Sequence, residues 1–301
     1  MHTYIGSGPY CYSNSLAMAL GEGAPSPSVI EVLTGSPFGA QLISGRLPLF
    51  DPYGWDPDLG LDAAIGLLGW TCRREGSEED AEALEKLRGA LAGGPVLAGP
   101  VEMGLLLHHP GLGQPIEADH FVLVLAADDD RVLLHDPQGF PYVSLPAKAF
   151  LAAWRAETIS YKTTRYTMRS AFRREREVTA HDALLASLPA AKRWLAMTGD
   201  VDVAPGTLGN AAALERFAGM LDEGADPAVL GLMTHFAVRV GTRRLADAAT
   251  ALGLTEAAAT AARQARLVGS LQYELTAGSP ATAAATLREL APSYAELAAA
   301  L

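Results

Sequence analysis

Residues 118–137 read ADHFVLVLAADDDRVLLHDP, and this stretch decides the fold expected for the first half of the chain. Two mostly apolar runs, 120–125 and 131–134, flank three consecutive aspartates at 128–130. Short apolar runs joined by such a turn predict a β-hairpin. Pro137 and Gly139 mark the end of its second strand.

The predicted hairpin brings His120 and Asp136 to the same end of the sheet. If Ala127 pairs with Arg131, then Val122 lies opposite Asp136, and His120 lies one pair away on the same face. A shift of one residue would turn one strand's side chains to the other face, and the turn alone does not fix the register. Alternation along both strands favours the register in which the two polar side chains meet.

Cys11 is the candidate nucleophile. Residues 11–20 predict a short helix that follows a loop of Gly and Pro and ends at Gly21. A lone cysteine is more often a small buried apolar residue. Here it opens a helix, where free N–H groups and the helix dipole stabilise a thiolate, and its neighbours are polar. These features favour a reactive thiol.

Together these residues suggest a catalytic triad. Cys11 would attack as the thiolate, His120 would hold the proton, and Asp136 would orient the imidazole. Cysteine on a helix, followed along the chain by His and Asp on strands, is the papain arrangement. The alternatives are a structural histidine with a turn aspartate before Pro137, or His135 as the base, although His135 should point to the opposite face.

Composition limits the functional class. The chain has 301 residues, enough for two domains, with 49% hydrophobic residues and a net charge of −11. That charge argues against nucleic acid and anionic membranes as partners. Neither a signal peptide nor a run long enough to span a membrane is visible. Two cysteines without metal-type spacing predict a cytoplasmic protein with free thiols.

The composition changes near residue 165, from Pro, Gly and aromatic residues to Ala, Leu and Arg at helical spacing. We therefore expect an α+β protein. Residues 1–165 would form a papain-like cysteine domain with an antiparallel sheet, and residues 166–301 an all-α bundle. Gly224, Gly253 and Gly278 are expected at helix ends, and Thr179 with Asp182 resembles a helix-capping pair.

Further residues are candidates for binding a substrate or an ion. Tyr10 and Asn14 flank Cys11, and His109 lies in a loop with His108. Tyr10, Asn14 and His109 could each contact substrate. For the two histidines, a solvated turn is the simpler interpretation. A set of donors at 108, 109, 119 and 120 matches no established ligand spacing. We therefore expect no metal.

A basic strip is the candidate site for a protein partner. Arg165, Arg169 and Arg173 recur every four residues, so they would form one basic face if this linker is helical. Such a face could dock an acidic acyl carrier protein. The alternative is a solvated face whose charges pair with Glu175 and Glu177.

The segments around Cys11, His120 and Asp136 also resemble a known family. Gly8–Cys11 with Asn14, residues 118–124 and residues 132–137 are similar to bacteriocin-leader peptidases, and more closely to the butirosin-biosynthesis acyltransferase family. The second half loosely resembles the helical C-terminal domain of that family. The resemblance implies transfer of an acyl or aminoacyl group from the phosphopantetheine thioester of an acyl carrier protein to a small-molecule amine, through Cys11. It implies no metal and no tightly bound cofactor.

One departure bears on the reaction. Papain-like enzymes often carry a Gln before the cysteine to bind the oxyanion, and residues 1–10 contain neither Gln nor Asn. The backbone N–H of Cys11 would need a second donor, such as Ser7 or Tyr4. An absent donor can cost about 10²–10³ in rate, which an activated thioester tolerates better than an amide. A peptidase, amidase or thioesterase on the same triad, a lactam-forming variant, and a non-catalytic binding module remain alternatives.

Overall fold

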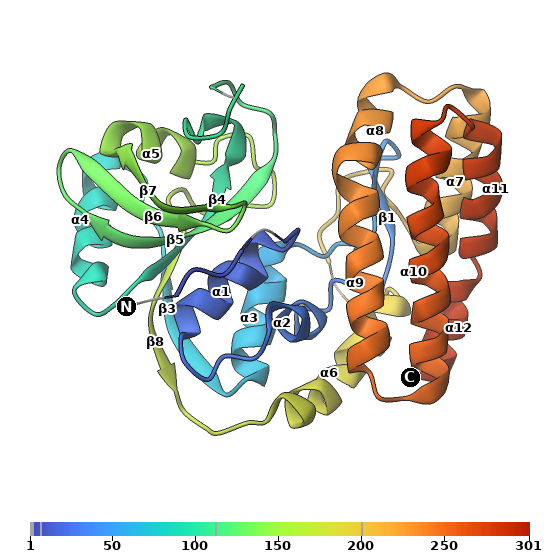
Figure 1. The fold of residues 1–301 in the computed structure, drawn as a ribbon, viewed down its shortest axis with the longest axis horizontal. Helices are drawn as coiled ribbons and strands as arrows, with labels where there is room; N and C mark the ends of the chain where they lie inside the picture. The colour runs from blue at the N-terminus through green and yellow to red at the C-terminus, as the bar shows by residue number, and fades with distance from the viewer. Residues whose placement is uncertain (1–2, 7, 112, 200) are drawn as a thin grey trace. The chain divides into compact units, whose positions relative to one another are not determined.

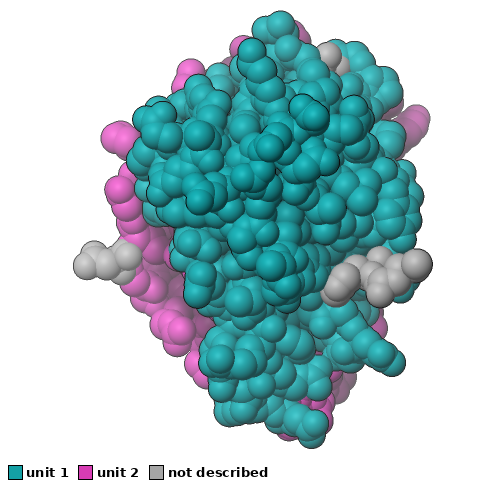
Figure 2. Space-filling model, turned by 90° about the vertical axis from the view of Figure 1, so that its left-hand side faces the viewer, with its two compact units in different colours: residues 1–27, 69–177 teal, residues 28–68, 178–301 magenta. Residues whose placement is uncertain are grey.

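The computed structural model describes residues 3–6, 8–111, 113–199 and 201–301. The chain forms two compact units, coloured separately in Figure 2. The first comprises residues 1–27 and 69–177, and the second residues 28–68 and 178–301. This division differs from the predicted boundary at 165/166: the first unit extends to residue 177, and an early segment joins the second unit.

The first unit is built on a six-stranded sheet in which all the pairings are antiparallel. The predicted α+β class is confirmed, with antiparallel sheets and a helical C-terminal region. The strand order across the sheet is β3 (Trp70–Glu75), β8 (Met168–Arg174), β4 (Val96–Glu102), β5 (Asp119–Ala127), β6 (Arg131–Asp136) and β7 (Phe140–Pro146).

The predicted hairpin is β5–β6. Its turn closes because the Asp128 carboxylate accepts hydrogen bonds from the backbone N–H groups of Asp130 and Arg131, at 2.9 and 2.7 Å. Side chains alternate along β5, so Val122 and Val124 face one side of the sheet and Phe121 faces the other. The two valines belong to the buried core of this unit.

Helices cover both faces of this sheet. The helices α4 (Asp80–Leu91) and α5 (Ala147–Trp154) lie on one side of the sheet and α1 (Cys11–Leu20) on the other (Figure 1). The first two pack on the face that carries Val122, and on the α1 side Tyr12 meets Phe121. A short 3₁₀ helix, Met103–Leu105, follows β4. Fully burying a side chain such as Phe150 in this core contributes about 1.5–3 kcal/mol.

The second unit combines a small sheet with helices. The sheet has the order β2 (Leu47–Leu49), β1 (Gln41–Ile43), β9 (Leu208–Gly209), so the second half of the chain is not wholly helical. The helices are α2 (Pro27–Leu33), α3 (Pro57–Leu67), α6 (Ala180–Leu195), α7 (Asn210–Glu223), α8 (Pro227–Leu232), a π-helical segment (Met233–Ala237), α9 (Val238–Ala251), α10 (Thr255–Thr276), α11 (Pro280–Leu290) and α12 (Ser293–Ala300).

The predicted helix ends are confirmed. Gly224, Gly253 and Gly278 each follow the end of a helix with positive φ angles of 92°, 64° and 70°. Thr179 is the N-cap of α6, because its Oγ1 accepts a hydrogen bond from the backbone N–H of Asp182 at 3.1 Å.

A buried ion cluster explains why residues 28–68 belong to the second unit. Arg244 of α9 donates to Glu31 of α2 at 2.8 Å, to Asp51 at 3.1 Å and to the carbonyl of Phe50 at 3.0 Å. The α9 backbone also lies so close to Phe50 that a Cβ on Gly241 would approach its ring carbons to 2.6 Å. The early segment therefore packs into the helical unit, although sequence composition placed it with the first.

Within the parts of the chain that the structure describes, no helix is both long enough and apolar enough to cross a membrane. The longest described helix, α10, illustrates why, because charged residues interrupt its apolar sequence at Glu256, Arg263, Arg266 and Glu274. Ala257, Ala261 and Ala265 line its packed face at intervals of one turn.

Candidate active site

Cys11 is the first residue of α1, as predicted. The helix is held against the strand that carries His120: the Ser15 hydroxyl donates a hydrogen bond to the backbone carbonyl of Phe121 at 3.1 Å. The rings of Tyr12 and Phe121 meet edge to face, with centroids 6.1 Å apart. These two contacts fix the N-terminus of α1 beside the start of β5.

The hairpin brings His120 to Asp136. Near the site the predicted register is confirmed, because Leu123 pairs with His135 and Val124 with Leu134. Near the turn it is wrong, because Ala127 pairs with Val132 rather than Arg131. An irregularity between Val124 and Ala126 absorbs the one-residue difference. The side-chain contact that the register argument required is present, with His120 Nε2 2.8 Å from Asp136 Oδ1.

Cys11 completes the group of three residues. Its side chain makes a hydrogen bond to His120. Because Nε2 of that ring is bonded to Asp136, the ring nitrogen left for the thiol is Nδ1. Burial disfavours a charged His120, but the charge and hydrogen bond of Asp136, together with Cys11, outweigh it and raise the pKa of His120 to about 10.

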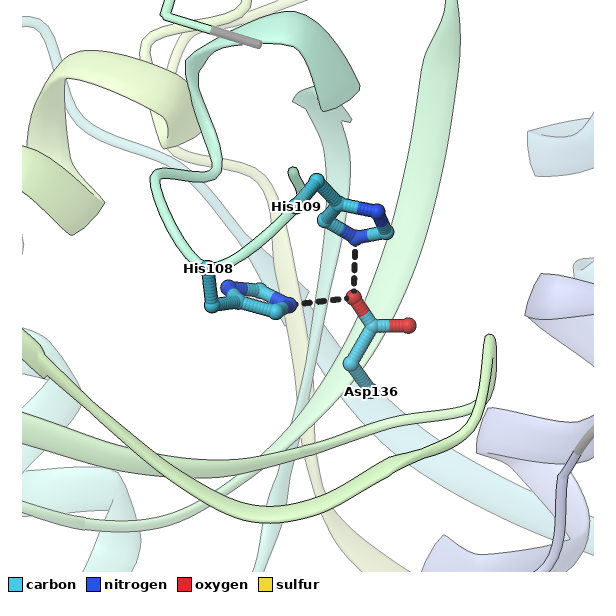
Figure 3. Close-up of side chains that lie close together, drawn as sticks. All are labelled: His108, His109 and Asp136. Atoms are coloured by element: carbon cyan, nitrogen blue, oxygen red, sulfur yellow. Dashed lines mark hydrogen bonds and ion pairs between the residues drawn. The ribbon is translucent and has the colours of Figure 1, made fainter. Parts of the chain in front are cut away.

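Asp136 is a fully engaged carboxylate with no exposed surface. Its Oδ1 accepts from His120 and, at 2.7 Å, from the backbone N–H of Gln138. Its Oδ2 lies 2.7 Å from Nε2 of both His108 and His109 (Figure 3). Burial alone would raise the pKa of Asp136, but the charge on His120 and the three imidazole hydrogen bonds hold it well below its usual range.

The loop that carries His108 and His109 is pinned at both ends. The buried Glu102 carboxylate accepts hydrogen bonds from the backbone N–H groups of Gly104 and Ile116, both at 3.0 Å. Phe140 packs edge-on against both imidazoles, at centroid distances of 5.3 Å to His108 and 5.1 Å to His109. The two rings therefore project from a fixed loop.

The structure gives His109 a role that the sequence argument did not anticipate. His109 was predicted to contact substrate, but its side chain is buried against Asp136. The pairing of Val101 with His120 in β4–β5 returns the chain after β4 to the His120 end of the sheet. Had the antiparallel pairing of β4 with β5 been inferred from the sequence, it would have predicted the contact of His109 with Asp136.

The other predicted site residues have different surroundings. Tyr10 and Asn14 are both buried, and the Asn14 amide donates to the Tyr10 carbonyl at 2.6 Å, which stabilises the start of α1. The Tyr4 hydroxyl donates to the Asp136 carbonyl at 2.9 Å, so its proton is already used. Ser7, the other candidate oxyanion donor, lies outside the described residues. His135 accepts from the backbone N–H of Tyr142 through Nδ1, at 3.1 Å.

The predicted basic helix face is wrong. Arg169 and Arg173 lie in strand β8, and Arg165 precedes that strand. Arg169 is fully buried, whereas Arg173 is exposed and donates to Glu175 at 2.6 Å. Arg165 pairs with Glu157 at 3.0 Å. Spacing by four suggested a helix, but pairing with β3 and β4 imposes the strand.

Comparison with known proteins shows that the chain is similar to a protein described as uncharacterized. Residues 204–301 match the family described as the YobF C-terminal domain. The chain is also 37% identical over 166 residues to the uncharacterized protein YobF of Bacillus subtilis (strain 168). That alignment covers 54% of this chain and 53% of YobF, so the chain spans about half the length of the curated relative it matches.

Proposed function

We propose that the first unit is a cysteine-dependent acyltransferase, which moves an acyl or aminoacyl group from a carrier-protein thioester to an amine. The observation that carries the proposal is the continuous hydrogen-bonded chain from Cys11 through His120 to Asp136. The resemblance of these segments to the butirosin-biosynthesis acyltransferases supplies the reaction type. Free cysteines suit a cytoplasmic setting, where thiols stay reduced.

In the first half-reaction, the Cys11 thiolate attacks the carbonyl carbon of the thioester. The tetrahedral intermediate then collapses, the bond to the phosphopantetheine sulfur breaks, and that sulfur takes the proton from the His120 imidazolium. The products are a Cys11 acyl-thioester, a free pantetheine thiol and a neutral His120. Asp136 keeps the ring oriented in both protonation states.

In the second half-reaction, the acceptor amine attacks the Cys11 thioester. His120 removes one proton from the attacking nitrogen, and the Cys11 thiolate leaves. The amide product departs, and the thiolate–imidazolium pair is restored. A thioester needs less oxyanion stabilisation than an amide, which fits a site where the Tyr4 hydroxyl is already engaged.

The test uses an acyl-pantetheine thioester as donor and intact-mass spectrometry as readout. We expect one acyl adduct, mapped to Cys11, that an added primary amine discharges as an amide. Cys11→Ala should form no adduct, whereas Cys72→Ala, at the other cysteine outside any disulfide, should behave like the wild type. Discharge by water at the same rate with and without amine would replace transferase by hydrolase. The absence of any adduct on Cys11 would refute both.

A further inference from the structure

We propose that His108, His109 and Asp136 form a binding site for a divalent transition-metal cation of the zinc class. Their donor atoms, one from each residue, all lie within 4.8 Å of one another. Both Nε2 atoms point at a single carboxylate oxygen, Oδ2 of Asp136 (Figure 3). This proposal does not depend on the proposed acyl transfer.

The donor chemistry fits such an ion. Two neutral imidazoles and one carboxylate are common zinc ligands, which bind at about 2.0–2.2 Å and leave a further position for water. Nitrogen donors disfavour magnesium and calcium, which prefer oxygen.

The site is built before any ion arrives. The side chain of His108 is 10% exposed, that of His109 8%, and that of Asp136 not at all. Glu102 and Phe140 hold the loop and the rings in place. Donors fixed in this way lose little conformational freedom on binding, which favours affinity.

The two oxygens of Asp136 serve different partners. The ion would take Oδ2, while Oδ1 keeps its contacts with His120 and Gln138.

Binding is tested directly on the full chain after removal of metal with a chelator. Co²⁺ is added as a spectroscopic stand-in for zinc, and Zn²⁺ affinity is measured by competition with a chromophoric chelator. We expect one equivalent per chain, and affinity at least about 100-fold weaker in His108→Ala/His109→Ala. His235→Ala, at an exposed histidine of the second unit, should bind like the wild type. Equal affinity in the wild type and the double variant would overturn the proposal.

A measurement on the wild type covers the case in which the double variant does not fold. X-ray absorption of the zinc-loaded chain should show only nitrogen and oxygen ligands, with imidazole scattering. A sulfur ligand would place the ion at a cysteine and refute the site. Cys11→Ala should retain full Co²⁺ affinity, so that a failed acyl-transfer assay and a failed metal site give different results.

Discussion

His120 Nε2 lies 2.8 Å from Asp136 Oδ1, at the end of the β5–β6 hairpin. A carboxylate that accepts from one ring nitrogen fixes the tautomer and leaves the other nitrogen for a second partner. That partner is Cys11, which α1 brings to the same end of the sheet. One strand pairing and one helix packing thus assemble the three side chains.

Replacing His120 with Ala should make Cys11 less reactive. The thiolate is the form that reacts with iodoacetamide, and an adjacent imidazolium favours the thiolate. We expect alkylation of Cys11 near pH 6 to slow by about tenfold or more. Peptide mapping gives the rate for each cysteine, and Cys72, also partly buried, is the internal control. Equal Cys11 rates in the two proteins would contradict the proposed pair.

Asp136→Asn should impair transfer while keeping the side chain's shape. An amide cannot balance the charge of a protonated His120, and it can present its NH₂ group instead of an acceptor oxygen. We expect the rate of acyl transfer to fall by about 100-fold or more. Near-UV circular dichroism checks that the packed core persists. A rate within twofold of the wild type would show that orientation by Asp136 is dispensable.

Local patterns predicted the hairpin, the start of α1 and the helix ends. His120 and Asp136 could be paired from sequence because they are joined by one short turn, so alternation alone gives their relative faces. Cys11 could be chosen because a helix start has a local signature. The bulge between Val124 and Ala126 was missed, since nothing in the local residue pattern distinguishes it.

Non-local contacts determine the structural features that the sequence did not predict. The contact of His109 with Asp136 depends on the β4–β5 register, and no short motif encodes that register. Arg244 and Glu31 are 213 residues apart, so their ion pair, which joins the early segment to the second unit, leaves no trace in local composition. Arg169 was expected on a helix because residues spaced by four share one helical face. The same spacing also fits a strand, and the strands that pair with β8 lie far away in sequence.

Arg244→Met should destabilise the second unit strongly. It removes the cation from a cluster in which Glu31 and Asp51 are buried. Breaking a buried pair on one side typically costs about 3–5 kcal/mol, because the remaining charge is uncompensated. Denaturant unfolding followed by circular dichroism measures the loss.

Arg243 provides the matched control, because it lies next in the chain and its own side chain, paired with Asp247, is 55% exposed. Arg243→Met should change the free energy of unfolding by about 0.5 kcal/mol or less. If both variants unfolded at the same denaturant concentration, the buried cluster would contribute nothing beyond the Arg243–Asp247 pair.

Thr179→Ala should weaken the start of α6. The substitution removes the oxygen that accepts from the Asp182 N–H, and loss of such a cap costs about 1 kcal/mol. Thr179→Ser keeps the hydroxyl and should stay close to the wild type. Thermal or denaturant unfolding compares the three proteins, and indistinguishable midpoints for Ala and Thr would show that the cap is not used.

Gly104→Ala should displace the loop that presents the two histidines. A Cβ at this position would lie 2.1 Å from the carbonyl oxygen of Gln114, so the backbone must move. We expect Co²⁺ affinity to fall by about tenfold or more, as when the supports of a metal site are disturbed. Gly89→Ala in α4, where a Cβ meets nothing within 4 Å, should leave the affinity unchanged. Undiminished Co²⁺ binding by Gly104→Ala would mean that the loop position does not control the site.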